Sequence, residues 1–146
     1  MKKFELTSEF VTFLGKKLFR IKALVSFGDV KEGELGGLVE KEENLDQSGN
    51  AWVSGDARVY GDAWVSGDAR VQNCRDYSAT SCFGSENRTT TFFRTKDGGI
   101  SVRCGCFYGT LNEFREKVKE RHGDSRLAKE YLMLADLMEF RLSKDE

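Results

Sequence analysis

The sequence has no proline, a single histidine and no long apolar run among its 146 residues. The single histidine, His122, excludes a catalytic histidine base anywhere before it in the chain. No apolar run approaches the roughly 20 residues that a membrane-spanning helix needs. A net charge of -1 gives no overall attraction for a polyanion. We therefore expect neither a membrane nor polymeric nucleic acid as a partner.

Charges also interrupt the N-terminal segment. Glu5 and Glu9 lie where a signal peptide needs an uninterrupted apolar stretch, so we expect a cytoplasmic protein. In that compartment the four cysteines are expected to be free thiols. Further on, KLFRIKALVSF (17–27) alternates well enough to predict one or two strands.

Residues 51–71 read AWVSGDARVYGDAWVSGDARV and repeat with a period of six. Alanine falls at 51, 57, 63 and 69, and valine falls at 53, 59, 65 and 71. This pattern is typical of the hexapeptide repeat of a parallel β-helix, where valine fills the interior and Gly-Asp makes the turns. On such a coil Trp52 lies beneath Arg70, which permits a cation–π contact.

An α-helix and an antiparallel meander are the alternative structures for the repeat. An α-helix is disfavoured, because each glycine inside it costs about 1 kcal/mol relative to alanine. An antiparallel meander stays open, because Gly-Asp also suits tight hairpin turns. A coil this short has two open ends, which must be capped or paired with another chain. We predict a strand lead-in and a β-helix platform over residues 1–74.

Residues 75–146 predict an α+β unit. The β-branched and aromatic run TTTFFRT (89–95), the turn KDGG (96–99) and ISVRCGCF (100–107) indicate a hairpin. Thr110 and Glu113 have capping-box spacing, and Gly123 can end the helix that they open.

Asp124 or Ser125 then begins a last helix. Its predicted apolar stripe is Leu127, Tyr131, Leu134 and Met138, joined by Leu137. The expected fold class is thus mixed β and α+β: a short hexapeptide-repeat β-helix followed by a β-hairpin or sheet and two C-terminal helices.

Metal binding and catalysis have weak support. Cys104 and Cys106 form C-x-C, whereas zinc usually takes C-x₂₋₄-C pairs, and in a strand both sulfurs pack on one face as small apolar groups. His122 lies at a predicted helix end, where the dipole favours it. Acyltransferases built on hexapeptide repeats use a histidine on the coil, which this chain lacks. We predict no metal, no cofactor and no catalytic residue.

A binding surface is the stronger candidate. Alternation places Arg88, Thr90, Phe92 and Arg94 on one strand face, and Ser101, Arg103 and Phe107 on another. Guanidinium groups hold phosphate oxygens, and aromatic rings stack on bases. Arg88, Arg103 and Phe107 are therefore candidate ligand-binding residues. The alternative is a solvated sheet face with no ligand.

The segment 83–137 contains GS-x-N-x-T-x-TFF, then CGCF-x-GT-x-x-EF, then HGD-x-x-x-A-K-E-Y. With this ordered run it resembles the Thoeris anti-defence family of phage proteins, which are signalling-nucleotide sponges. The hexad part resembles a module common in phage and prophage proteins, often called polymer-forming.

The resemblance implies a non-enzymatic homo-oligomer, from dimer to hexamer, in the cytoplasm of the infected bacterial host. It implies that cyclic ADP-ribose isomers made by TIR-domain enzymes bind between subunits, and that some members also bind cyclic di- or trinucleotides. Carried over to this chain, it implies Phe114 for stacking, Asp124 for ribose or base hydroxyls and Arg141 for the pyrophosphate.

Two further functions stay open. The hexads fit a structural or assembly protein of a phage particle. A hydrolase or transferase would use Cys104, Cys106 and His122.

Overall fold

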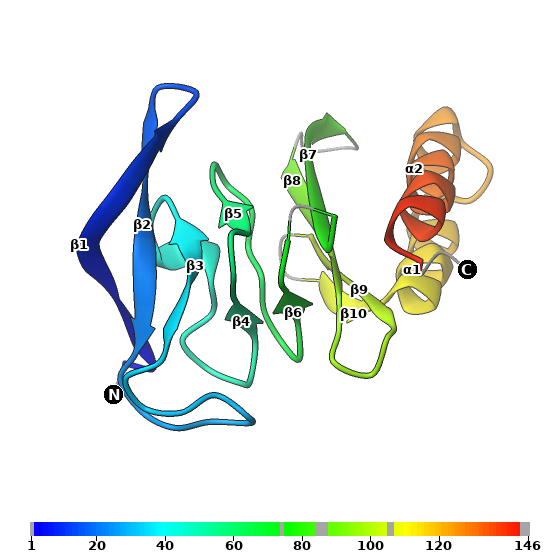
Figure 1. Cartoon of the computed structure of the whole chain (residues 1–146). Helices are drawn as coiled ribbons and strands as arrows, with labels where there is room; N and C mark the ends of the chain where they lie inside the picture. Colours follow the sequence, from blue (N-terminus) through cyan, green and yellow to red (C-terminus); the bar gives the residue numbers. More distant parts are fainter. Residues whose placement is uncertain (1, 74, 84–87, 105–106, 144–146) are drawn as a thin grey trace.

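The computed structural model describes residues 2–73, 75–83, 88–104 and 107–143. Within these residues the chain is a mixed β and α structure, with ten strands followed by two C-terminal helices. Figure 1 shows, from one end of the molecule to the other, an N-terminal hairpin, the repeat, a four-stranded sheet and the helix pair. The order along the molecule thus follows the order along the chain.

A long antiparallel hairpin covers one end of the repeat. It consists of β1 (Phe4–Phe13) and β2 (Lys16–Ala23), and β2 also pairs antiparallel with β3 (Leu35–Val39). Leu14 and Gly15 form the turn between the first two strands, both with positive φ (53° and 78°). The sequence predicted one or two strands within residues 17–27, and the structure has one there, β2; β1 lies before the segment in which strands were predicted.

The repeat itself pairs in parallel. Its short strands are β4 (Trp52–Val53), β5 (Arg58–Val59) and β6 (Arg70–Val71), and a 3₁₀ helix, η1 (Glu42–Asn44), precedes them. The parallel partners are Leu38 with Arg58, Leu45 with Val65, and Trp52 with Arg70. The antiparallel meander is therefore wrong for this segment.

Burial follows the hexad period. The four repeat valines are completely buried, and the four repeat alanines are at most 2% exposed. Gly55, Gly61 and Gly67 have positive φ, which is the conformation that the Gly-Asp turns require. The predicted roles of valine and glycine are confirmed.

The predicted pairing of Trp52 with Arg70 is confirmed. In place of the expected cation–π contact, each of the two side chains contacts other groups. The Arg70 guanidinium donates to the Asn50 carbonyl (2.6 Å) and the Asp29 carboxylate (2.8 Å). The Trp52 ring packs edge-on against Phe27 instead, with 5.4 Å between ring centroids. The turn at residues 27–30 therefore supplies one partner to each side chain: Phe27 to Trp52, and Asp29 to Arg70.

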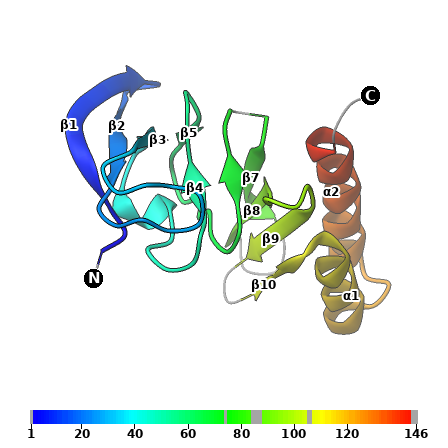
Figure 2. The ribbon, with the colours of Figure 1, turned by 60° about the horizontal axis from the view of Figure 1, so that its bottom comes forward.

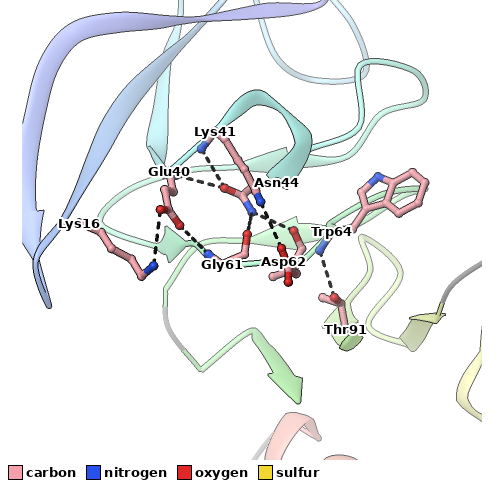
Figure 3. Close-up of polar contacts among 9 residues, drawn as sticks. Lys16, Glu40, Lys41, Asn44, Gly61, Asp62, Trp64 and Thr91 are labelled. Carbon is pink, nitrogen blue, oxygen red and sulfur yellow. Dashed lines mark hydrogen bonds and ion pairs between the residues drawn. The ribbon is translucent and has the colours of Figure 1, made fainter. Parts of the chain in front are cut away.

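A buried asparagine fastens η1 to the following repeat. The Asn44 side chain accepts hydrogen bonds from the backbone N–H of Glu40 (3.2 Å) and Lys41 (2.9 Å). It donates to the carbonyls of Gly61 (3.1 Å) and Ala63 (2.9 Å). Figure 3 shows this side chain at the centre of the network. All four hydrogen-bonding positions of the amide are therefore used inside the protein.

A second antiparallel sheet lies between the repeat and the helices (Figure 2). Its strands are β7 (Tyr77–Phe83), β8 (Arg88–Arg94), β9 (Ile100–Cys104) and β10 (Phe107–Thr110), in the order β10-β9-β8-β7. Phe93 belongs to the hydrophobic core of the repeat, whereas Phe92 belongs to the core beneath the helices. Strand alternation therefore sends neighbouring residues into two different cores.

The helices begin and end as their sequence signals predict. Thr110 caps α1 (Leu111–His122) in a reciprocal capping box with Glu113, and Gly123 follows with a φ of 57°. Ser125 caps α2 (Arg126–Leu142) by accepting from the Ala128 N–H. Among the described residues, neither helix has the length and apolar character that a membrane crossing requires.

One position of the predicted stripe on α2 is wrong. Tyr131, Leu134 and Met138 are buried, and Leu127 is partly buried against the same core. Leu137 is 55% exposed, because it lies on another side of the helix from the face that packs against α1 and the sheet.

Candidate functional site

Arg103 lies on the sheet face that meets the repeat. Its guanidinium carbon is 3.6 Å from the Trp64 ring centroid and 5.8 Å from that of Tyr108. The backbone N–H of Trp64 donates to the Thr91 hydroxyl at 3.0 Å, which fixes the repeat against β8 (Figure 3). Both rings keep part of their surface in solvent. We call this group, made of Trp64, Arg103 and Tyr108, the Arg103 junction.

Arginine stacks on aromatic rings when the plane of its guanidinium is desolvated, and here Arg103 also joins the repeat to the second sheet.

The buried Arg103 Nε has no hydrogen-bond partner among the described residues, so the side chain is held there by its ring contacts.

Phe107 and Phe114 lie on the other side of the sheet, against the helices, so the prediction that Phe107 shares a face with Arg103 is wrong. Phe114 is 4% exposed, and its ring contacts those of Phe92 (5.8 Å between centroids), Phe107 (5.9 Å) and Tyr131 (5.7 Å). Phe107 is only half-buried. Within one chain, Phe114 is thus a core side chain, and Phe107 is the ring of this pair that reaches solvent.

The remaining predicted site residues are dispersed. Asp124 is exposed in the turn between the helices, and Arg141 is exposed in the last turn of α2. Arg88 begins β8, and its side chain lies outside the described part of the structure. The structure therefore brings Phe107 to Phe114, whereas no hydrogen bond or ion pair within the described residues joins Arg103, Asp124 and Arg141.

The predicted binding face of β8 has a different use. Thr90 and Phe92 are completely buried, because the helices cover this face. Arg94 joins three parts of the chain: Nε donates to the Leu142 carbonyl at 2.6 Å, and Nη1 lies 3.1 Å from the Asp76 carboxylate. Alternation identified the face correctly, but it could not show that later helices would cover it.

A groove of about 760 Å³ lies where the turn after β8 meets the ends of both helices. The charged side chains that line it are Asp68, Asp97, Glu113, Arg115 and Glu139. Arg115 is already bonded to Glu139 (2.7 Å) and to Asp136 (2.8 Å). The hydrogen bond that Arg115 donates to the Glu139 carboxylate is the main cause that raises the pKa of Arg115 above its usual range.

The carboxylates of this groove are held in place locally. Asp97 accepts from the Thr95 hydroxyl and from the Gly99 N–H, and these bonds lower the pKa of its carboxyl. Acidic groups outnumber the one paired arginine, so the groove repels a pyrophosphate. The groove is not predictable from the sequence, because its walls come from segments that are distant along the chain.

Cys104 and His122 make contacts with different parts of the chain. The Cys104 sulfur accepts from the Thr90 hydroxyl (3.2 Å), and the His122 ring stacks on Tyr131 at 5.7 Å between centroids. Cys106 lies outside the described residues. Within the described part of the chain, no three His, Cys, Asp or Glu side chains are grouped as a metal site needs.

Comparison with known proteins gives no match: neither a protein-family model nor a curated protein matches this chain.

Proposed function

We propose that this protein is a non-enzymatic phage anti-defence sponge. It binds and sequesters a cyclic ADP-ribose isomer, or a cyclic di- or trinucleotide, that a bacterial immune system makes. The observation that carries the proposal is the ordered run of residues within 83–137. The residues of the run that the structure describes lie on β8, at the end of β9, on β10 with the start of α1, and from the end of α1 into α2, and these elements contribute to one hydrophobic core.

The exposed charges support a site between subunits. Arg141 and Asp124 are free to face a second chain, with Arg141 holding a pyrophosphate and Asp124 holding hydroxyl groups. The half-buried Phe107 ring, backed by Phe114, supplies a stacking surface. The acidic groove of one chain does not suit an anion, so a homo-oligomer, from dimer to hexamer, is part of this proposal.

We further infer that residues 36–73 form about two coils of a hexapeptide-repeat β-helix, of which the first, over residues 36–50, is irregular. The parallel partners lie 18 or 20 residues apart along the chain, which is close to three hexads. The buried valines and alanines support the same arrangement. In this proposal the repeat is a platform, and the ligand-binding and oligomerisation unit spans residues 75–146.

Isothermal titration calorimetry tests the function directly. Purified protein is titrated with a cyclic ADP-ribose isomer produced by a TIR-domain enzyme, and separately with a cyclic trinucleotide. We expect nanomolar binding of one of them, and recovery of the unchanged ligand after heat release. Cleaved product would instead indicate an enzyme, and absence of heat with both ligands would exclude the sponge.

A matched pair of variants tests the site. Arg141→Ala is expected to weaken binding by at least about tenfold, since it removes a charge-assisted contact to the pyrophosphate. Arg121→Ala removes an equally exposed arginine from the end of α1 and is expected to bind normally. Equal affinities for the two variants would remove Arg141 from the site.

A further inference from the structure

The groove beside the turn between β8 and β9 concentrates negative charge. Four carboxylates line it, from Asp68, Asp97, Glu113 and Glu139, against the one guanidinium of Arg115, which gives a formal charge of -3. The whole chain carries only -1. The groove is therefore a local acidic surface on a nearly neutral protein, and its field attracts cations.

Two neighbouring turns bring Asp68 and Asp97 to the same wall of the groove. The Lys96 N–H donates to the Asp68 carbonyl at 3.0 Å, which joins the turn of the repeat to the turn after β8. One oxygen of the Asp97 carboxylate accepts from the Thr95 hydroxyl and the Gly99 N–H. Its other oxygen, and both oxygens of Asp68, accept no hydrogen bond from another described residue. These oxygens are available to a ligand that donates hydrogen bonds.

A buried hydroxyl group faces the same groove without a partner. Ser101 is only 7% exposed, and it lines the groove from β9. Its hydroxyl forms no hydrogen bond with another described residue. A polar group that is buried and left unbonded costs free energy, so a donor bound in the groove would satisfy it. This hydroxyl indicates a ligand independently of the carboxylates.

The distribution of the lining groups identifies the kind of cation. One carboxylate lies on a turn of the repeat, one on the β8–β9 turn and one on each helix, around a volume of about 760 Å³. The side chains of Ile100 and Leu111 add apolar surface to the same lining. A linear polyamine has ammonium groups separated by methylene chains. Its ammonium groups suit the dispersed carboxylates, and its methylene chains suit the apolar side chains.

We propose that this groove binds a linear polyamine. Asp68 and Asp97 hold one ammonium group at the end beside the repeat, and the Ser101 hydroxyl accepts a hydrogen bond from the ligand. Glu113 attracts a second ammonium group at the end beside the helices, where Arg115 already neutralises Glu139. The site takes a cation rather than an anion, so it is separate from the proposed nucleotide site and stands independently of the sponge function.

Isothermal titration calorimetry of the full chain with spermidine tests the site. We expect saturable one-to-one binding at low ionic strength, which weakens as salt approaches about 0.15 M because the carboxylates are exposed. Mg²⁺, titrated in the same buffer, is expected to bind at least about tenfold more weakly, since it cannot span the dispersed carboxylates. Absence of saturable spermidine binding, or equal binding of Mg²⁺, would overturn the proposal.

The repeat offers a matched pair of variants. Asp56 and Asp68 occupy the same position of two identical AWVSGD hexads, and both are exposed, but only Asp68 lines the groove. Asp68→Asn is expected to weaken spermidine binding at least about threefold, whereas Asp56→Asn should leave it unchanged. Equal affinities for these two variants would show general attraction to the surface and refute the site.

Ser101→Ala tests the buried hydroxyl. Loss of a hydrogen bond to a charged donor is expected to weaken spermidine binding about tenfold. Thermal melts check that each variant is folded, and an unchanged affinity in folded Ser101→Ala would contradict the role of this hydroxyl. Spermidine binding by a protein that binds no cyclic nucleotide would support this site while refuting the sponge.

Discussion

Replacing Asn44 with alanine removes a side chain that uses all four of its hydrogen-bonding positions. The amide is completely buried, and it joins the backbone of residues 40–41 to the carbonyls of Gly61 and Ala63. Glu40 keeps a second acceptor, because its N–H also bonds to the Val59 carbonyl. Asn44→Ala therefore leaves up to three backbone groups without these partners: the buried Ala63 carbonyl and two partly buried groups, the Lys41 N–H and the Gly61 carbonyl.

The expected loss of stability follows from that count. An unsatisfied buried group costs about 1–3 kcal/mol, and partial relaxation lets some groups reach water, so we expect a total of about 3–5 kcal/mol. For a chain of this size, this loss lowers the melting temperature by roughly 6–20 °C. Urea unfolding followed by circular dichroism measures the free energy, and calorimetry measures the temperature.

Two companion variants isolate the cause. Asn50→Ala removes an exposed asparagine from the neighbouring turn and should change the stability by less than about 0.5 kcal/mol. Asn44→Asp keeps the size of the side chain but replaces the donor with an oxygen that faces two carbonyls. Burial raises the pKa of that new carboxyl, so the loss should shrink at low pH, where the protonated acid can donate. If Asn44→Ala costs no more than Asn50→Ala, the assigned role of the network is wrong.

Three further predictions concern other parts of the chain. Gly67→Ala should lower the free energy of unfolding, measured in urea, by about 1–3 kcal/mol more than Gly61→Ala does. Both glycines have positive φ, but only the new Cβ at Gly67 meets the Tyr108 hydroxyl. Equal losses for the two variants would contradict this packing. Burial lowers the pKa of Lys3 to about 8, so between about pH 8 and 10.4 the unfolded chain binds more protons and stability rises with pH. Lys3→Met should remove that rise in a series of melts, and an unchanged pH profile would refute it. Leu14→Asn should stabilise the protein by about 0.5–1 kcal/mol, because Leu14 has positive φ and asparagine tolerates this conformation in a turn followed by glycine. A lower melting temperature of the variant would contradict this prediction.

Local signals in the sequence predicted local structure well. The hexad period identified the buried valines, and Thr110 with Glu113 identified the start of α1. The turn at 96–99 was also predicted, since Arg94 pairs with Ile100 across it. Each of these features depends on residues that are close along the chain.

Features that depend on distant segments were not predictable in the same way. Alternation placed Thr90 and Phe92 on one face of a strand, but the helices that cover this face come later in the chain. Apolar spacing assigned Leu137 to the core, although the side of α2 that packs is decided by α1 and the sheet. The ligand-binding roles of Arg103, Asp124 and Arg141 stay predictions, because their contacts in one chain do not identify a ligand.

Phe92 and Phe93 also determine how the protein is expected to unfold. These neighbours lie in different hydrophobic cores, so a change in β8 disturbs the repeat and the helices together. Melting of either core removes the support of the strand that the other core needs. We therefore expect the whole chain to unfold in one cooperative transition, with the repeat and the helices losing structure at the same temperature.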